Sequence, residues 1–170
     1  TMDRNANRVI YTSTYSKPFA TGVRIGYGLL PEPLLTAALR VKGNHDFGTT
    51  NLLQQLITRA LTSGAYEMHV QKLRQRYAKK ASTMMSAIQR YLPEGVKWVQ
   101  PAGGLYIWAR MPARLKTDLK SKLFKAALRQ KIIYVPGNLC YADDPTRRKP
   151  NREMRLSFGS ASIKNIEEGI

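Results

Sequence analysis

The sequence predicts an α/β protein, and three observations carry that prediction. Short segments rich in β-branched and aromatic residues alternate with longer segments in which apolar residues recur every three to four positions. One long amphipathic segment, Tyr66 to Leu92, is expected to form a single helix. From Pro93 onward the expected order is strand, strand, helix, strand, strand, helix, which suits a small sandwich domain of one sheet and its helices.

The first part of the chain contains two expected strands and two expected helices. Val9 to Thr12 is predicted as a buried strand and Ile25 to Leu30 as another, whose glycines suit a close approach of two backbones. Helices are expected from Pro31 to about Val41 and from Asn51 to Leu61, with a loop over 43–50 between them. Two strands and two helices cannot bury both faces of a doubly wound sheet, so this part is expected to belong to something larger.

The second part adds four expected strands and two expected helices. Pro93 and Gly95 end the long helix, and Gly103-Gly104 marks a turn between the first two strands. The strands are expected over 96–99, 105–109, 132–135 and 154–158. The helices are expected over 119–130 and from Ser162 to the last residue, Ile170.

Composition and charge narrow the class of protein. The chain is 43% hydrophobic, enough for a real core, and its net charge is +17. The basic residues are scattered over helical segments and one loop, and no helix-turn-helix, zinc-finger or RNA-binding pattern accompanies them. No apolar run is long enough to span a bilayer, and no secretory signal is visible. The single cysteine, Cys140, excludes an internal disulfide, so the expected compartment is the cytoplasm.

A lysine loop is the most informative motif. Lys17 follows an expected strand, Thr14 and Ser16 place hydroxyls beside it, and Arg24 lies seven residues further on. An amine of this kind can form a Schiff base with an aldehyde, and hydroxyls with an arginine can surround a phosphate. The alternative is an exposed lysine on a polar turn, but it requires the strand, the hydroxyls and Arg24 to coincide by chance.

Arg155 is the second candidate. It is opposite in phase to Met154, Leu156 and Phe158, so one face of the expected strand is apolar and Arg155 lies on the other. An arginine on a half-buried strand can bind a substrate carboxylate. It can equally pair with a surface acid, and the strand pattern alone leaves both readings open.

Several other chemically capable residues favour ordinary roles. His45 and His69 lie far apart without metal-ligand spacing, and Cys140 suits a small buried hydrophobe better than a nucleophile. Asp143 and Asp144 are interpreted as solvated loop charges. No metal site is expected.

Several segments in a fixed order resemble the second half of a class I/II aminotransferase, a fold type I enzyme dependent on pyridoxal 5'-phosphate (PLP). The chain looks most like the α-aminoadipate/kynurenine aminotransferases and the aminotransferase domains of MocR-type regulators. The segments that carry the resemblance are Arg8-Val9-Ile10, Ser16-Lys17, Gly22-Val23-Arg24-Ile25-Gly26-Tyr27, Pro101-Ala102-Gly103-Gly104, Val135-Pro136-Gly137-Asn138, Arg155-Leu156-Ser157-Phe158 and Ser160-Ala161-Ser162.

The resemblance implies a role for each candidate residue. Lys17 would be the catalytic lysine that holds PLP as a Schiff base and carries the proton. Thr14, Ser16 and Arg24 would contact the cofactor phosphate, and Arg155 would bind the substrate α-carboxylate. Asn51 would lie in a segment that reaches toward the partner subunit of a homodimer.

The resemblance also implies an architecture and a function. Residues 1–64 would be part of the large, cofactor-binding domain and contain the end of its sheet. Residues 65–92 would be a long connecting helix, and residues 93–170 the small C-terminal domain.

The implied reaction moves an amino group between an amino acid and a 2-oxo acid. The alternative is the effector-sensing domain of a MocR/GntR-type transcription regulator, which would touch nucleic acid only through an upstream DNA-binding domain. Because the acid expected at the PLP ring nitrogen has no counterpart here, we expect little or no activity from these residues alone.

Overall fold

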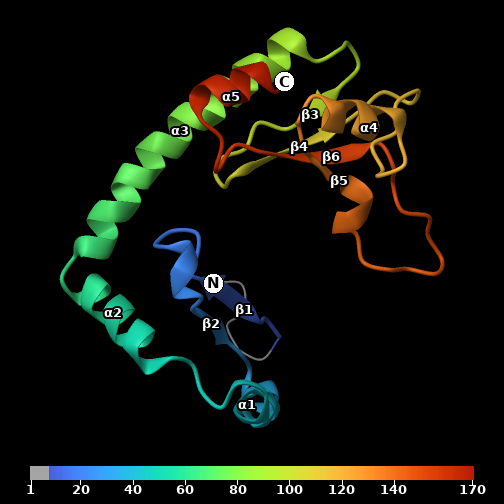
Figure 1. Cartoon of the computed structure of the whole chain (residues 1–170). Coiled ribbons are helices and arrows are strands. Elements are labelled where there is room, and N and C mark those ends of the chain that lie inside the picture. Colours follow the sequence, from blue (N-terminus) through green and yellow to red (C-terminus); the bar gives the residue numbers. More distant parts are fainter. Residues whose placement is uncertain (1–7) are drawn as a thin grey trace. The chain divides into compact units, whose positions relative to one another are not determined.

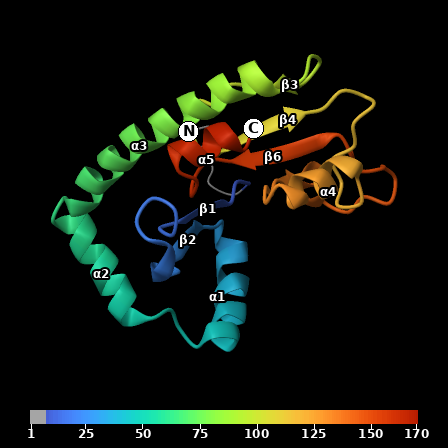
Figure 2. The same ribbon diagram turned by 45° about the horizontal axis from the view of Figure 1, so that its top comes forward.

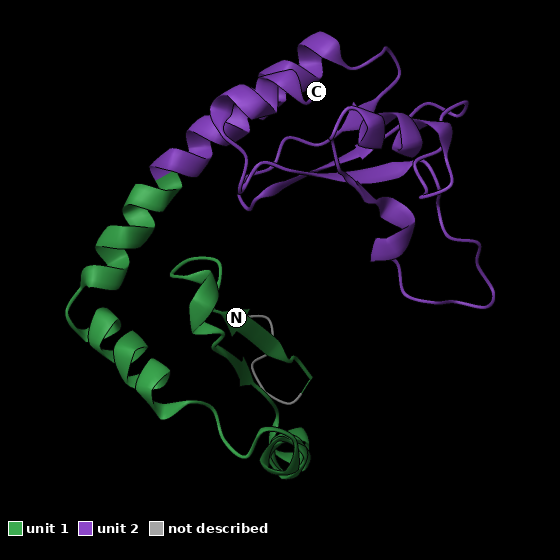
Figure 3. Cartoon of the chain, viewed as in Figure 1, with its two compact units in different colours: residues 1–74 green, residues 75–170 purple. Residues whose placement is uncertain are grey.

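The computed structural model describes residues 8–170, which divide into two compact units, one extending to Arg74 and the other running from Gln75 to Ile170 (Figure 3). Unit 1 contains strands β1 (Tyr11–Thr14) and β2 (Gly26–Leu29), the short 3-10 helix η1 (Thr21–Val23), and helices α1 (Glu32–Asp46) and α2 (Asn51–Thr62). Helix α3 (Ala65–Tyr91) begins in unit 1 and continues into unit 2 (Figure 1). The α/β class expected from the sequence is confirmed.

The small sheet of unit 1 is an antiparallel pair, in which Tyr11 lies opposite Leu29 and Thr14 opposite Gly26. The predicted close approach at the glycines is confirmed, because a Cβ added at Gly26 would lie 2.6 Å from the carbonyl oxygen of Ser13. The predicted burial of the first strand is wrong, since Tyr11 remains 52% exposed. In the described part of unit 1, β1 pairs only with β2, and the buried cluster forms elsewhere, around Val23.

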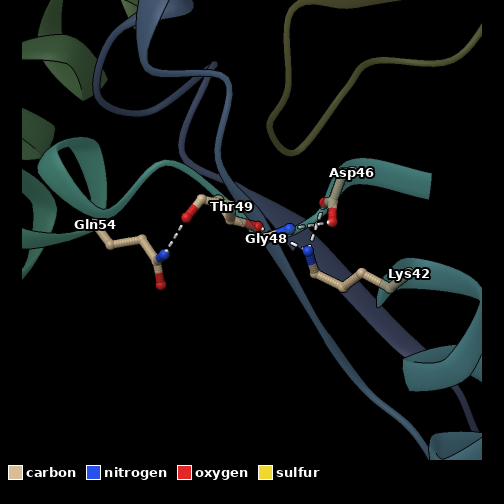
Figure 4. A network of polar contacts seen from close by, with 5 residues as sticks. All are labelled: Lys42, Asp46, Gly48, Thr49 and Gln54. Atoms are coloured by element: carbon tan, nitrogen blue, oxygen red, sulfur yellow. Dashed lines mark hydrogen bonds and ion pairs between the residues drawn. The ribbon is translucent and has the colours of Figure 1, made fainter. Parts of the chain in front are cut away.

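Helix α1 extends beyond its predicted end near Val41, and a set of polar contacts explains where it stops. Lys42 forms an ion pair with Asp46 one turn later, and its Nζ also donates to Thr49 Oγ1 at 2.9 Å. The amide of Gly48 donates to Asp46 Oδ1 at 3.0 Å, in a left-handed conformation that favours glycine. Figure 4 shows this network, which closes the turn between α1 and α2.

Unit 2 follows the predicted order of elements. After α3 come β3 (Lys97–Trp98), β4 (Tyr106–Arg110), α4 (Lys122–Arg129), β5 (Val135–Pro136), the 3-10 helix η2 (Gly137–Cys140), β6 (Glu153–Ser157) and α5 (Ile163–Glu168). The four strands form an antiparallel sheet in the order β3-β4-β6-β5. Figure 2 shows β4 and β6 side by side, with α5 near the second half of α3.

Helices cover one face of this sheet. Met84 and Ile88 of α3 pack with Ile107 of β4 and with Ile166 of α5 in one cluster. Residues of α4 pack against Met154 in a second cluster. The second face of the sheet therefore carries the side chains that alternate with the core residues: Tyr106, Trp108 and Arg110 from β4, and Glu153, Arg155 and Ser157 from β6.

Some boundaries differ from expectation. Helix α4 begins later than the predicted Leu119, because the Ser121 hydroxyl caps it by accepting the amide of Phe124. Helix α5 ends at Glu168 instead of continuing to Ile170. The predicted division into residues 1–64, 65–92 and 93–170 stays a prediction. Within residues 8–170, none of the helices has the length and apolar character needed to cross a membrane.

Candidate functional site

A closed loop between β1 and β2 carries the predicted lysine. The backbone amide of Tyr15 donates to the carbonyl of Ile25 at 2.9 Å, which ties the two ends together. Further amide-to-carbonyl bonds run from Phe19 and Ala20 back to Tyr15. Lys17 and Arg24 therefore lie on one short closed segment, which we call the lysine loop (Thr14 to Arg24).

The two predicted hydroxyls lie at the start of this loop. Thr14 Oγ1 accepts the backbone amide of Ser16 at 3.1 Å and donates to the carbonyl oxygen of Ile25 at 3.3 Å. Ser16 itself is buried, with 6% of its surface exposed. Thr14 thus holds the turn that leads directly into Lys17.

Apolar contacts anchor the loop inside unit 1. Val23 and Ile25 are buried against Ile57 of α2, with Tyr15 and Phe19 packed around them. The rings of Tyr15 and Phe19 also contact Tyr66 of α3, at centroid distances of 5.9 and 6.1 Å. Apolar side chains thus fix the loop from within, while Lys17 and Arg24 are both exposed.

Arg24 has an unusual backbone. Its φ of 49° and ψ of 31° lie in the left-handed region, at the C-terminal end of η1. Residues with a Cβ rarely adopt this conformation unless their surroundings impose it, and such residues concentrate at functional sites. In the described chain neither Arg24 nor Lys17 forms an ion pair. The loop therefore presents two cations without carboxylates, beside two hydroxyls.

This donor set suits a phosphorylated aldehyde. A guanidinium and hydroxyls bind phosphate oxygens, and a nearby primary amine can react with a carbonyl carbon. All four predicted residues, Thr14, Ser16, Lys17 and Arg24, are brought together in unit 1.

Arg155 lies in unit 2, on the second face of the sheet. It is paired across the strands with Trp108 of β4 and Val135 of β5. Its guanidinium carbon lies 4.3 Å from the centroid of the Tyr106 ring, a cation–π contact. Its Nε is buried and has no hydrogen-bond partner among residues 8–170. The surface partner allowed by the alternative reading is not found in that part of the chain.

Sequence reasoning missed the neighbours of Arg155. Glu153 is buried two positions earlier on β6, and its carboxylate pairs with Arg110 and accepts the hydroxyl of Tyr141. This hydrogen bond raises the pKa of Tyr141. Strand alternation could have placed Glu153 on the face of Arg155, but the link to Arg110 depends on the register between β4 and β6.

Of the other residues considered in the sequence, Cys140 is the one whose predicted burial is wrong. Asp143 pairs with Lys149 on the surface, as expected for a loop charge. The two-glycine turn is present, with Gly104 at a φ of +87°. Cys140 is exposed instead of buried, because it ends η2 at the surface. Asn51 is the exposed first residue of α2.

Comparison with known proteins identifies the family of this chain. The family described as aminotransferase class I and II matches residues 1–170. The chain is 33% identical over 164 residues to aromatic-amino-acid aminotransferase 1 of Thermococcus litoralis, covering 96% of this chain and 37% of that protein. It is 31% identical to the HTH-type transcriptional regulator YdfD of Bacillus subtilis, covering 100% of this chain and 33% of that protein.

A solved structure agrees with both matches. Kynurenine aminotransferase of Pyrococcus horikoshii, crystallised with PMP and kynurenine, superposes with a TM-score of 0.86 at 32% identity, covering 97% of this chain and 39% of that one. The chain thus spans between one third and two fifths of the length of these proteins. Its fold is the corresponding part of a fold type I PLP-dependent transferase. The chain belongs to the class I and II aminotransferase family.

Proposed function

We propose that this chain is part of a PLP-dependent aminotransferase that moves an amino group between an amino acid and a 2-oxo acid. The observation that carries the proposal is the lysine loop. It presents an exposed amine and an exposed guanidinium, with the hydroxyls of Thr14 and Ser16 close to them in the sequence, on one closed segment of a chain that belongs to the aminotransferase family. A relative of the same fold has been crystallised with PMP, the amino form of PLP.

Each residue of the loop has a distinct task in this proposal. The amine of Lys17 would hold PLP through its aldehyde carbon. Once the substrate amino group has taken that place, the freed amine would move a proton at the substrate α-carbon. Thr14, Ser16 and Arg24 bind the cofactor phosphate, with Arg24 supplying the charge. When bound, PLP supplies an electron sink that acidifies the α C–H bond of the substrate.

Arg155 receives the substrate α-carboxylate. Its guanidinium stacks on Tyr106, its Nε is unpaired, and no ion pair in residues 8–170 involves it. A planar guanidinium matches a carboxylate with two parallel hydrogen bonds, which would orient the α-carbon. The side chain that the substrate carries is not specified by this contact.

The assembly and organisation are further parts of the proposal. Residues 1–64 are part of the large, cofactor-binding domain, residues 65–92 are a long connecting helix, and residues 93–170 are the small C-terminal domain. The protein acts as a cytoplasmic homodimer in which the segment around Asn51 reaches toward the partner subunit. The resemblance to dimeric enzymes and the exposed position of Asn51 support the dimer. A single cysteine that forms no disulfide within the chain suits a reducing compartment.

A second function is favoured by one observation, the match over the whole chain to a transcriptional regulator. In that case the same lysine loop would bind PLP for sensing an effector, and an additional domain would bind DNA. Binding of the full-length protein to DNA, measured as a function of PLP and amino acid, separates this function from transamination.

The test of the lysine loop is covalent capture of PLP. We expect the 170-residue chain mixed with PLP to develop a visible absorbance band that borohydride converts to an adduct on Lys17, located by peptide mass spectrometry. Lys17→Ala removes this adduct, whereas Lys72→Ala, an exposed lysine of α3, leaves it unchanged. Labelling spread over many lysines, equal in both variants, would contradict the proposed site.

A further inference from the structure

The second face of the sheet in unit 2 places an acid close to the proposed carboxylate-binding arginine. Glu153 and Arg155 are two positions apart in β6 and therefore share a face, with Cα atoms about 7 Å apart. A long arginine side chain spans that separation with ease. A carboxylate and a guanidinium so placed would ordinarily form a charge-assisted pair, and such a pair would occupy Arg155.

The carboxylate of Glu153 is bound by residues other than Arg155. Arg110, directly opposite Glu153 in the strand register, brings its Nε to 3.2 Å from Oε1. The hydroxyl of Tyr141 donates to Oε2 at 2.5 Å. Both carboxylate oxygens therefore have a partner, and the side chain of Glu153 is only 8% exposed.

The surroundings hold this arrangement in place. Thr117 Oγ1 donates to the backbone carbonyl of Glu153 at 2.6 Å, which fixes the strand at this position. The start of η2 packs tightly on the same residue, because a Cβ added at Gly137 would lie 2.7 Å from that of Glu153. The ring of Tyr141 contacts Trp108, the cross-strand neighbour of Arg155, at a centroid distance of 6.2 Å.

Among residues 8–170, Arg155 is left with an aromatic neighbour and no anion. Its guanidinium lies over Tyr106, and its buried Nε lacks a hydrogen-bond partner within the described residues. A half-buried cation with an unused donor attracts any carboxylate that can reach it.

We propose that Arg110 and Tyr141 are positioning residues that bind Glu153 and so keep Arg155 free for the substrate carboxylate. The inference rests on the proposed role of Arg155 in substrate binding. It adds a specificity device, because an internal carboxylate would otherwise compete with the external one for the same guanidinium.

Removal of Arg110 should allow Glu153 to pair with Arg155. In Arg110→Met the buried carboxylate of Glu153 loses its charge partner, and Arg155, two positions along the same strand, is a cation on the same face that can replace it. Pairing between these two residues then weakens the binding of an external carboxylate. Glu153→Gln in the same background removes the competing charge while keeping the shape of the side chain, so binding should return.

The experiment follows the Nε–Hε resonance of Arg155 in the 15N-arginine-labelled 170-residue chain, assigned by its loss in Arg155→Lys. Sodium propionate serves as the probe, with sodium chloride at equal ionic strength as the blank. We expect Arg110→Met to raise the dissociation constant for propionate about fivefold or more. Tyr141→Phe should raise it less, and Arg110→Met/Glu153→Gln should restore it. Arg129→Met, which removes an exposed arginine of α4, should leave it unchanged.

The outcomes distinguish a failure of the carboxylate-binding role of Arg155 from a failure of the positioning role of Arg110 and Tyr141. If propionate does not shift the Arg155 resonance in the unaltered chain, both the carboxylate role of Arg155 and this inference fail. If propionate binds there equally in the chain with and without Arg110 and Tyr141, only this inference fails. Weakened binding in Arg110→Met that Glu153→Gln does not restore would show a loss of strand order, and would also overturn the inference. Tyr141→Phe keeps the test open if Arg110→Met fails to fold.

Discussion

At the scale of single residues, the contact between β1 and β2 depends on Gly26. The missing side chain there lets the carbonyl of Ser13 approach to a distance that a Cβ would not tolerate. The obstacle is backbone, so the strands themselves would have to move apart.

We therefore expect Gly26→Ala to lower the free energy of unfolding by about 1–3 kcal/mol. Gly22→Ala is the matched control on the lysine loop, because nothing lies within 4 Å of the Cβ it would add. That change should leave stability within about 0.5 kcal/mol. Urea unfolding followed by circular dichroism measures both, and equal stabilities for the two variants would contradict the close contact.

The residue scale also shows what a sequence can reveal about the site. Thr14, Ser16, Lys17 and Arg24 were predicted because they lie close together in the chain, and the closed loop keeps them close in space. The Arg110–Glu153–Tyr141 contacts were not predicted, because they join three separate segments. Such contacts depend on strand register and on the path of η2.

At the scale of elements, the turn between α1 and α2 responds to pH through Asp46. Its pKa is lowered first by the hydrogen bond from Lys42 and then by the amide of Gly48. A carboxyl whose pKa is lowered by folding stabilises the turn fully above its unfolded pKa. That contribution is lost as the pH falls toward the folded pKa.

The Gly48 amide should therefore titrate with a midpoint below about 3.9, the ordinary pKa of aspartate. The measurement is the chemical shift of the Gly48 amide proton against pH. In Asp46→Asn this titration should disappear, while titration elsewhere in the chain persists. A midpoint at or above the ordinary value would show that Lys42 and Gly48 do not hold the carboxylate in solution.

Elements were predicted best where their own sequence dominates. The bounds of α3 differ by one residue at each end from the predicted 66–92, because a long amphipathic repeat identifies a helix without reference to neighbours. The burial of β1 was wrong, because burial depends on which elements cover a strand. Helix α1 continues past Gly43 because the contacts of Lys42 and Asp46 stabilise its last turn.

At the scale of the whole molecule, unit 1 exposes several large apolar side chains. Phe47 is 93% exposed and Leu52 is 76% exposed. Unit 1 also contains an apolar hollow of about 550 Å³ along α1, which is lined in part by Leu34 and Val41. Exposed apolar surface of this kind favours association between chains.

We expect the chain to self-associate as its concentration rises, despite a net charge of +17 that opposes contact between copies. Sedimentation velocity at several concentrations measures this. Leu52→Lys should shift the distribution toward monomer, whereas Leu139→Lys, at an exposed leucine of η2, should not. A monomer at every concentration in the unaltered chain would contradict the expectation.

The left-handed backbone of Arg24 has a consequence in terms of the genetic code. Every arginine codon is one base change from a glycine codon, and glycine adopts this conformation without the penalty of about 1–2 kcal/mol that a Cβ brings. A single base change would therefore replace Arg24 by glycine, which adopts this conformation without that penalty. An arginine that is held in this conformation agrees with the proposed role of its guanidinium in binding phosphate.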